Sequence, residues 1–151
     1  MSEFPLIAGV ELGGTKINCI LARGPDHIED EVQVPTTHPA ETLVAIERVL
    51  ERWKGFSALG IASFGPIAID PLCEHYGHII KTPKVGWSYT SIAPRLRQFT
   101  GVPTGFHTDV VAAAFAEMRW GAAAGLKDLA YITVGTGVGV GLLAGGCPLE
   151  G

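Results

Sequence analysis

The stretch Glu11-Leu12-Gly13-Gly14-Thr15-Lys16 lies between two apolar segments, 7–10 and 17–21, where a strand is expected to reverse direction. Two adjacent glycines let backbone N–H groups approach an anion closely, and Thr15 and Lys16 add a hydroxyl and a point charge. Glu11 is an unexpected neighbour for a phosphate unless a cation lies between them. The turn therefore predicts a phosphate and magnesium site, although an ordinary glycine hairpin with a solvated lysine fits the same residues.

A second glycine turn, Gly135-Thr136-Gly137-Val138-Gly139, also places small residues and a threonine hydroxyl between two expected strands. Together, the two turns fit opposite clamps on a polyphosphate better than either turn does alone. Each leads into a strand and not into a helix, so neither matches the phosphate loop of nucleotide hydrolases or the dinucleotide fingerprint. A Rossmann fold is therefore not expected.

Asp109 directly follows an expected strand and begins an alanine-rich helix. A carboxylate in this position is either a helix cap or a catalytic group. Ligands gather at the carboxyl ends of strands in sheets of this kind, which favours the catalytic interpretation. An aspartate facing a bound phosphate chain can accept the proton of an attacking hydroxyl, and phosphoryl transfer asks little else of the protein beyond positioning and charge stabilisation.

The rest of the pattern predicts an α/β fold, with three strands in a meander followed by alternating strands and helices. The expected strands cover 6–11, 17–23, 28–34, 58–63, 103–107, 130–134 and 138–143. The expected helices cover 40–53, 91–99 and 110–120, with Pro39 suited to a first helical position and Gly121 suited to an end. This order predicts a mixed sheet with helices on its faces.

The segment 129–148 carries no charged residue and is about long enough to span a bilayer. Glycines at 135, 137, 139 and 141 alternate with other residues, including β-branched ones, which favours two strands joined by a turn. We therefore expect this segment to form a buried hairpin and no membrane helix.

Composition excludes several classes of function. The 151 residues include 11 Lys and Arg against 15 Asp and Glu without a basic cluster, which argues against a nucleic-acid surface. Cys19, Cys73 and Cys147 are odd in number and far apart, as expected of reduced thiols in a cytoplasmic protein. The start of the chain has no secretory signal, and His75 and His78 lack a second ligand pair for zinc.

Five motifs occur in the order seen in the ROK family of sugar kinases, and the chain most resembles the bacterial fructokinases of that family. They are Glu11-Leu-Gly-Gly-Thr-Lys16, Ser63-Phe-Gly-Pro66, Lys81-Thr-Pro-Lys-Val-Gly-Trp87, Thr108-Asp-Val110 and Gly135-Thr-Gly-Val-Gly139. The resemblance covers essentially the whole chain. It implies the actin-like ATPase (ribonuclease-H-like) fold and transfer of the ATP γ-phosphoryl group to a hexose hydroxyl.

The resemblance also implies a role for each matched residue. Asp109 would be the catalytic base, and Glu11 would help to position Mg²⁺, through water. The ATP phosphates would be held by Gly13, Gly14, Thr15 and Lys16 and, from the second turn, by Gly135, Thr136 and Gly137. The sugar pocket would be lined by Ser63, Gly65, Pro83, Lys84, Thr108 and Asp109. His38, Trp87 and Glu117 are interpreted as structural.

The sequence departs from the family pattern at Val111, where a small polar residue is usual, at Val140, where glycine is usual, and in length. The implied lobes are 1–121 and the start of a nucleotide-binding lobe at 122–151. Family members continue with a zinc-binding segment, the remaining sugar ligands and most of the adenine-binding lobe. We therefore expect a fragment that exposes an apolar edge at 130–143 and is not a competent kinase by itself. A full-length form would bind Zn²⁺ and form a homodimer.

Several alternatives stay open. An inactive half-domain or a sugar-binding pseudokinase fits the same motifs, and glucose, mannose or an N-acetyl sugar fits as well as fructose, because several sugar ligands would follow Gly151. A transcriptional repressor of the same family would carry a basic helix-turn-helix before the first strand. Only residues 1–5 precede that strand, which disfavours a repressor.

Overall fold

The computed structural model describes residues 4–135 and 137–150. The chain divides into two compact units, Met1–Phe106 and His107–Gly151, and each is described by itself. The lobe boundary expected at Gly121 stays a prediction. The division into compact units comes earlier, because the helix that follows Phe106 packs on the strands of the second unit.

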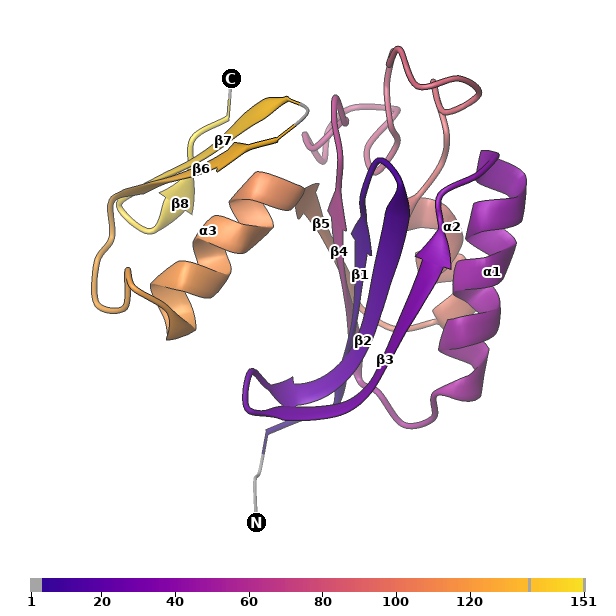
Figure 1. Cartoon of the computed structure of the whole chain (residues 1–151), viewed down its shortest axis with the longest axis horizontal. Coiled ribbons are helices and arrows are strands. Elements are labelled where there is room, and N and C mark those ends of the chain that lie inside the picture. Colours follow the sequence, from indigo (N-terminus) through magenta and orange to yellow (C-terminus); the bar gives the residue numbers. More distant parts are fainter. Residues whose placement is uncertain (1–3, 136, 151) are drawn as a thin grey trace. The chain divides into compact units, whose positions relative to one another are not determined.

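A mixed sheet forms the centre of the first unit, in the order β3-β2-β1-β4-β5 (Figure 1). Its strands are β1 (Ile7–Leu12), β2 (Lys16–Gly24), β3 (His27–Pro35), β4 (Ala58–Ser63) and β5 (Thr104–Thr108). β1 pairs antiparallel with β2 and parallel with β4, and β2 pairs antiparallel with β3. The predicted meander and the predicted mixed sheet are confirmed, with strand ends within one residue of those expected.

Two helices, α1 (Pro39–Arg52) and α2 (Ala93–Thr100), lie next to each other and pack on this sheet (Figure 1). Pro39 occupies the first turn of α1, as predicted, and the left-handed Gly101 ends α2. Arg95 of α2 donates two hydrogen bonds to the Glu47 carboxylate of α1, at 2.6 and 2.9 Å. Along β1, buried residues alternate with more exposed ones, because every second side chain of a strand points into the core.

Cys19 lies in this core and is fully buried, whereas Cys73 and Cys147 are exposed, and all three are free thiols. Burial raises the pKa of the Cys19 thiol to about 12. Since the thiolate is the reactive form, Cys19 is a packing residue and not a nucleophile.

The second unit consists of α3 (Asp109–Trp120) and a sheet with the order β6-β7-β8. Its strands are β6 (Leu129–Val134), β7 (Val138–Ala144) and β8 (Cys147–Pro148), the last of which is too short for a sequence pattern to indicate. Gly121 ends α3 as predicted, but in an extended conformation. The Glu117 carboxylate, which accepts from the Ala122 N–H at 2.9 Å, occupies the space that a side chain at Gly121 would take, so a larger residue there would displace this carboxylate.

The expectation of a buried hairpin at 129–148 is wrong, because one face of β6 and β7 is exposed. The opposite face packs on α3. The expected exposure of apolar residues at 130–143 is confirmed: the exposed fractions include 77% for Val134 and 71% for Val138. In the described part of the chain, no helix is long and apolar enough to cross a membrane.

Candidate functional site

The turn between β1 and β2 is held by hydrogen bonds to its carbonyl groups. The Gly13 N–H donates to the Lys16 carbonyl at 3.0 Å, which closes the turn. Thr36, just after β3, donates through its hydroxyl to the Gly13 carbonyl at 2.9 Å and through its N–H to the Thr15 carbonyl at 3.0 Å. The Lys84 ammonium donates to the Gly14 carbonyl at 2.6 Å. All four carbonyls from Gly13 to Lys16 therefore accept a hydrogen bond.

The N–H groups of this turn are used differently. Among the described residues, the N–H groups of Gly14 and Thr15 have no acceptor, and both residues are exposed. A side chain added at Gly14 would meet no atom within 4 Å, whereas one at Gly13 would lie 2.6 Å from the Lys16 carbonyl oxygen. Gly13 therefore permits the tight turn, and Gly14 leaves open space beside two unpaired donors. Such donors bind anions.

Glu11, at the entrance of the turn, is held by a residue that the sequence pattern did not single out. Asn18 lies opposite Glu11 in the β1–β2 register, and its amide donates to the Glu11 carboxylate at 2.7 Å. The Asn18 Oδ1 atom is buried and has no partner among the described residues. A polar residue inside the apolar run 17–21 was the available signal for it.

The Glu11 carboxylate and the Asn18 Oδ1 atom fit Mg²⁺, which prefers one or two carboxylates together with water and substrate phosphates. Asn18 fixes one oxygen of the exposed Glu11 carboxylate next to the turn. No group of three or more His, Cys, Asp and Glu in residues 4–135 and 137–150 is arranged to hold a metal ion.

His75 and His78 form an edge-on ring pair, and the Nδ1 atom of His78 lies 3.0 Å from the His75 carbonyl oxygen.

The loop 81–90 lies beside the turn because Trp87 anchors it in the core of the first unit. Trp87 is fully buried, packs edge-on against Phe64 with ring centroids 5.4 Å apart, and donates from its indole to the Thr37 carbonyl at 3.0 Å. Its structural assignment is confirmed. Lys84 reaches the turn from this loop and also lies 5.9 Å from the centre of the Phe64 ring.

The other predicted sugar ligands of the first unit lie at the end of β4 and in the same loop. Leu12 pairs with Ser63, and the Phe64 N–H donates to the Leu12 carbonyl at 3.0 Å, so the end of β4 is adjacent to the phosphate turn. Ser63 is fully buried, and its hydroxyl donates to the Phe64 carbonyl at 2.9 Å. Gly65, which precedes a cis proline, and Pro83 are exposed. Their roles as sugar ligands stay predictions.

In the second unit, Thr108 and Asp109 form the start of α3. Thr108 is the N-cap, since its hydroxyl accepts from the Val111 N–H at 3.3 Å. Asp109 is the first helical residue, and its Oδ1 atom accepts from the Val110 N–H at 2.9 Å. The N-cap of α3 is therefore Thr108 and not Asp109. The catalytic interpretation of Asp109 stays a prediction.

The second glycine turn joins β6 and β7. The Gly135 N–H donates to the Gly137 carbonyl at 2.9 Å, and a side chain added at either glycine would meet no atom within 4 Å. Thr136 lies outside the described residues. The phosphate-binding role of this turn stays a prediction.

His107, at the end of β5, should make the stability of the chain depend on pH. Burial lowers its pKa below the ordinary value of 6.5, and the charge of Glu150 offsets this only in part. Its Nδ1 atom accepts from the Thr108 N–H at 2.8 Å, and its buried Nε2 atom has no partner among the described residues. The unfolded chain therefore takes up a proton more readily than the folded chain, and the free energy of unfolding should fall as the pH drops below about 6.5.

The test is urea unfolding at about pH 7.5 and pH 5.5, on either side of the ordinary histidine pKa. His107→Gln should show a smaller loss of stability at the lower pH than the unsubstituted chain. His27→Gln, at an exposed histidine of β3, is the control and should keep the full loss. An equal pH dependence in all three proteins would contradict this account of His107.

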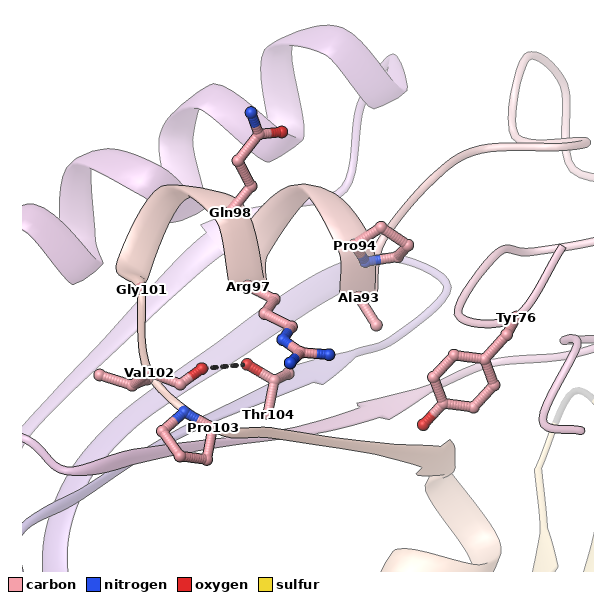
Figure 2. Close-up of a pocket in the computed structure, with 9 residues that line it drawn as sticks. All are labelled: Tyr76, Ala93, Pro94, Arg97, Gln98, Gly101, Val102, Pro103 and Thr104. Carbon is pink, nitrogen blue, oxygen red and sulfur yellow. Dashed lines mark hydrogen bonds between the residues drawn. The ribbon is translucent and has the colours of Figure 1, made fainter. Parts of the chain in front are cut away.

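The first unit also contains a cavity of about 640 Å³ between α2, the start of β5 and the loop that carries Tyr76 (Figure 2). The residues that line it are Tyr76, Ala93, Pro94, Arg97, Gln98, Gly101, Val102, Pro103 and Thr104. None of them is a predicted site residue, so the cavity is not part of the expected phosphate or sugar site.

Comparisons with known proteins identify the same family as the five motifs. Residues 7–151 match the model of the ROK family. The chain is 38% identical over 147 residues to the fructokinase of Zymomonas mobilis, covering 94% of this chain and 49% of that protein. It is 36% identical over 139 residues to the fructokinase of Pediococcus pentosaceus, covering 92% of this chain and 48% of that protein. The chain thus spans about half the length of the curated relatives it matches, and it corresponds to their N-terminal half.

A solved structure gives the same result for the fold. The ROK family glucokinase from Streptomyces griseus, in complex with glucose and AMPPNP, superimposes with a TM-score of 0.81 at 27% identity, over 97% of this chain and 46% of that one. The architecture is accordingly the α/β, actin-like ATPase fold that the motifs implied. Its match to the family model over residues 7–151 shows that the chain belongs to the ROK family.

Proposed function

We propose that the chain supplies the phosphate-binding lobe of an ATP-dependent sugar kinase whose substrate is a hexose, with fructose favoured. The observation that carries the proposal is the turn from Gly13 to Lys16. Its carbonyls are all engaged, while the N–H groups of Gly14 and Thr15 have no acceptor among the described residues. A loop so arranged offers positive dipoles to an anion without having to rearrange.

In the proposed reaction a hexose hydroxyl attacks the γ-phosphorus of ATP, and the bond from that phosphorus to the β-phosphate oxygen breaks. Asp109 takes the proton of the hydroxyl, and the products are ADP and a hexose phosphate. Lys16 and the two glycine turns would hold the phosphates, and Glu11, oriented by Asn18, would hold Mg²⁺ through water. When bound, Mg²⁺ would neutralise part of the negative charge on the phosphate oxygens.

Fructose is favoured because the Zymomonas mobilis and Pediococcus pentosaceus relatives are named fructokinases. Glucose, mannose and N-acetyl sugars are the competing substrates, and the Streptomyces griseus neighbour was solved with glucose. A cytoplasmic location belongs to the same proposal, supported by three unpaired cysteines. Homodimer formation and zinc binding in a full-length form stay predictions.

A second candidate is an inactive half-domain that binds phosphate or sugar without transferring a phosphoryl group. It is favoured by the exposed apolar residues of β6 and β7. Both candidates bind a ligand, but only the kinase candidate requires both phosphate binding at the turn and turnover.

Binding of Mg-ATP should raise the midpoint of thermal unfolding, because a ligand that binds only the folded state stabilises it by about 2.7 kcal/mol at a hundred times its Kd. Gly14→Val should abolish the shift by placing a branched side chain in the open space beside the unpaired N–H groups. Gly60→Val is the matched control, because a side chain there also meets no atom within 4 Å and β-branched residues suit a strand.

The control variant should keep the shift of the unsubstituted chain. If Mg-ATP produces no shift, or the same shift in Gly14→Val, the phosphate turn is wrongly assigned. Repeating the measurement with fructose and glucose in the presence of Mg-ATP compares the two hexoses.

A further inference from the structure

The cavity of Figure 2 contains one charged side chain, that of Arg97 in α2, among the described residues that line it. The exposed Arg97 guanidinium extends into the cavity, and it has no hydrogen bond or ion pair with any described residue. Arg95, two residues earlier on the same helix, is instead bonded twice to the Glu47 carboxylate. Arg97 therefore keeps its N–H donors and its charge for a ligand or for water.

The loop that carries Tyr76 is fixed against the start of α2. The Gly77 carbonyl accepts from the N–H groups of Ile92 at 3.1 Å and Ala93 at 2.9 Å. Gly77 has a φ of +81°, and a side chain there would lie 2.7 Å from the Pro94 Cδ atom, so loop and helix are in close contact. Tyr76 is half-buried, and its hydroxyl points into the cavity without a partner among the described residues (Figure 2).

The segment 101–104 forms a second wall, which is also held by hydrogen bonds. The Leu59 N–H donates to the Pro103 carbonyl at 2.9 Å, and the Thr104 hydroxyl donates to the Val102 carbonyl at 3.1 Å (Figure 2). The side chains of Val102 and Pro103 add apolar surface beside the Arg97 charge. A cavity with fixed walls loses little conformational freedom when a ligand binds.

The cavity is separate from the predicted phosphate site. Pro103 is bonded to Leu59 near the start of β4, whereas Ser63, at the end of that strand, lies next to the phosphate turn. Four steps along a strand separate Leu59 from Ser63, which is about 13 Å. The volume of about 640 Å³ lies in the usual range for cavities that bind small organic molecules.

We propose that this cavity binds a small organic anion. Its carboxylate or phosphate group would contact the Arg97 guanidinium and the Tyr76 hydroxyl, and its apolar body would pack on Val102 and Pro103. The guanidinium matches two oxygens of either group. A single cation would leave most of the charge of a triphosphate uncompensated, so ATP is not the expected ligand. The inference does not depend on the proposed phosphoryl transfer.

The test is a titration of the ¹⁵N-labelled chain, followed through its backbone amide signals, with phenyl phosphate, benzoate and the neutral benzyl alcohol as probes. Phenyl phosphate or benzoate should shift the signals of Tyr76, Val102 and Thr104 until they saturate. Benzyl alcohol should bind at least about tenfold more weakly, because it gains no charge-assisted hydrogen bond. The anion that binds more tightly identifies the group that Arg97 prefers.

Arg97→Gln should weaken binding of the tighter anion by about tenfold or more, and Tyr76→Phe should weaken it by about twofold to tenfold. Neither residue belongs to the buried core, so both variants should keep the fold, as thermal unfolding would verify. Arg52→Gln is the matched control, because Arg52 is also an exposed arginine in the last turn of a helix but does not line the cavity. It should keep the full affinity.

Three results would each overturn the proposal: no shift with either anion at concentrations on the order of 10 mM, equal binding of benzyl alcohol, or an affinity that Arg97→Gln leaves unchanged. Inorganic phosphate separates the cavity from the phosphate turn. Because it has no apolar body, it should bind the cavity at least about tenfold more weakly than the tighter anion. Shifts confined to residues 13–16 would overturn the cavity site and leave the proposed function intact.

Discussion

Trp87→Ala should lower the free energy of unfolding of the first unit by about 3–5 kcal/mol, the usual cost of removing a large aromatic side chain from a core. Trp87 is fully buried, contacts the Phe64 ring edge-on and satisfies the Thr37 carbonyl through its indole. The substitution leaves both a cavity and an unpaired carbonyl. Because domains are stable by only about 5–15 kcal/mol, this change removes a large part of the total.

Urea unfolding followed by far-ultraviolet circular dichroism measures the change. Tyr89→Ala is the matched control, since Tyr89 belongs to the same loop and is 63% exposed. It should change stability by about 0.5 kcal/mol or less, as surface substitutions do. If the two variants lose similar stability, the loop 81–90 is not anchored by Trp87.

The Trp87 substitution should also weaken phosphate binding. Trp87 fixes the loop from which Lys84 donates to the Gly14 carbonyl at 2.6 Å. Trp87→Phe keeps most of the packing but loses the indole N–H, so it should fall between the unsubstituted chain and Trp87→Ala in both stability and Mg-ATP binding.

Local sequence signals predicted the elements well, because each has an apolar period and a clear end. Pro39 begins α1, Gly121 ends α3, and β4 matches the expected range 58–63. Burial was not predictable in the same way. The pattern of β6 and β7 is that of strands covered on both faces, but among the described residues α3 covers one face and the residues of the other face are exposed.

The candidate site likewise has a part that local sequence predicts and a part that depends on contacts between distant residues. The turn at Gly13 and Gly14 is encoded locally and was predicted from its glycines. The bond from Lys84 to Gly14 joins residues 70 positions apart and depends on the buried Trp87, so no local pattern contains it. Asn18 stands out in the sequence as a polar residue in the apolar run 17–21, but its partner is known only from the β1–β2 register, which places it opposite Glu11.

Asp109→Asn should lower the turnover number of a full-length sugar kinase that contains this chain by about 10²–10⁴-fold, which is the usual contribution of a general base. Thr108 caps α3, and an asparagine Oδ1 atom can accept the Val110 N–H as the carboxylate does, so the helix start should be kept. The KM for Mg-ATP should stay the same, because the substitution removes proton acceptance and no phosphate contact.

The measurement is steady-state phosphorylation of fructose by a single-chain chimera, in which residues 1–150 are followed by the unmatched half of the Zymomonas mobilis fructokinase. Asp109→Asn and Glu117→Gln are compared in this chimera. Glu117 is the matched control: it is a carboxylate on the same helix whose structural role, acceptance from the Ala122 N–H, a glutamine can also perform. Glu117→Gln should therefore retain turnover. Full activity in Asp109→Asn would remove the base from the mechanism, and equal losses in both variants would show that the effect comes from α3 and not from proton transfer.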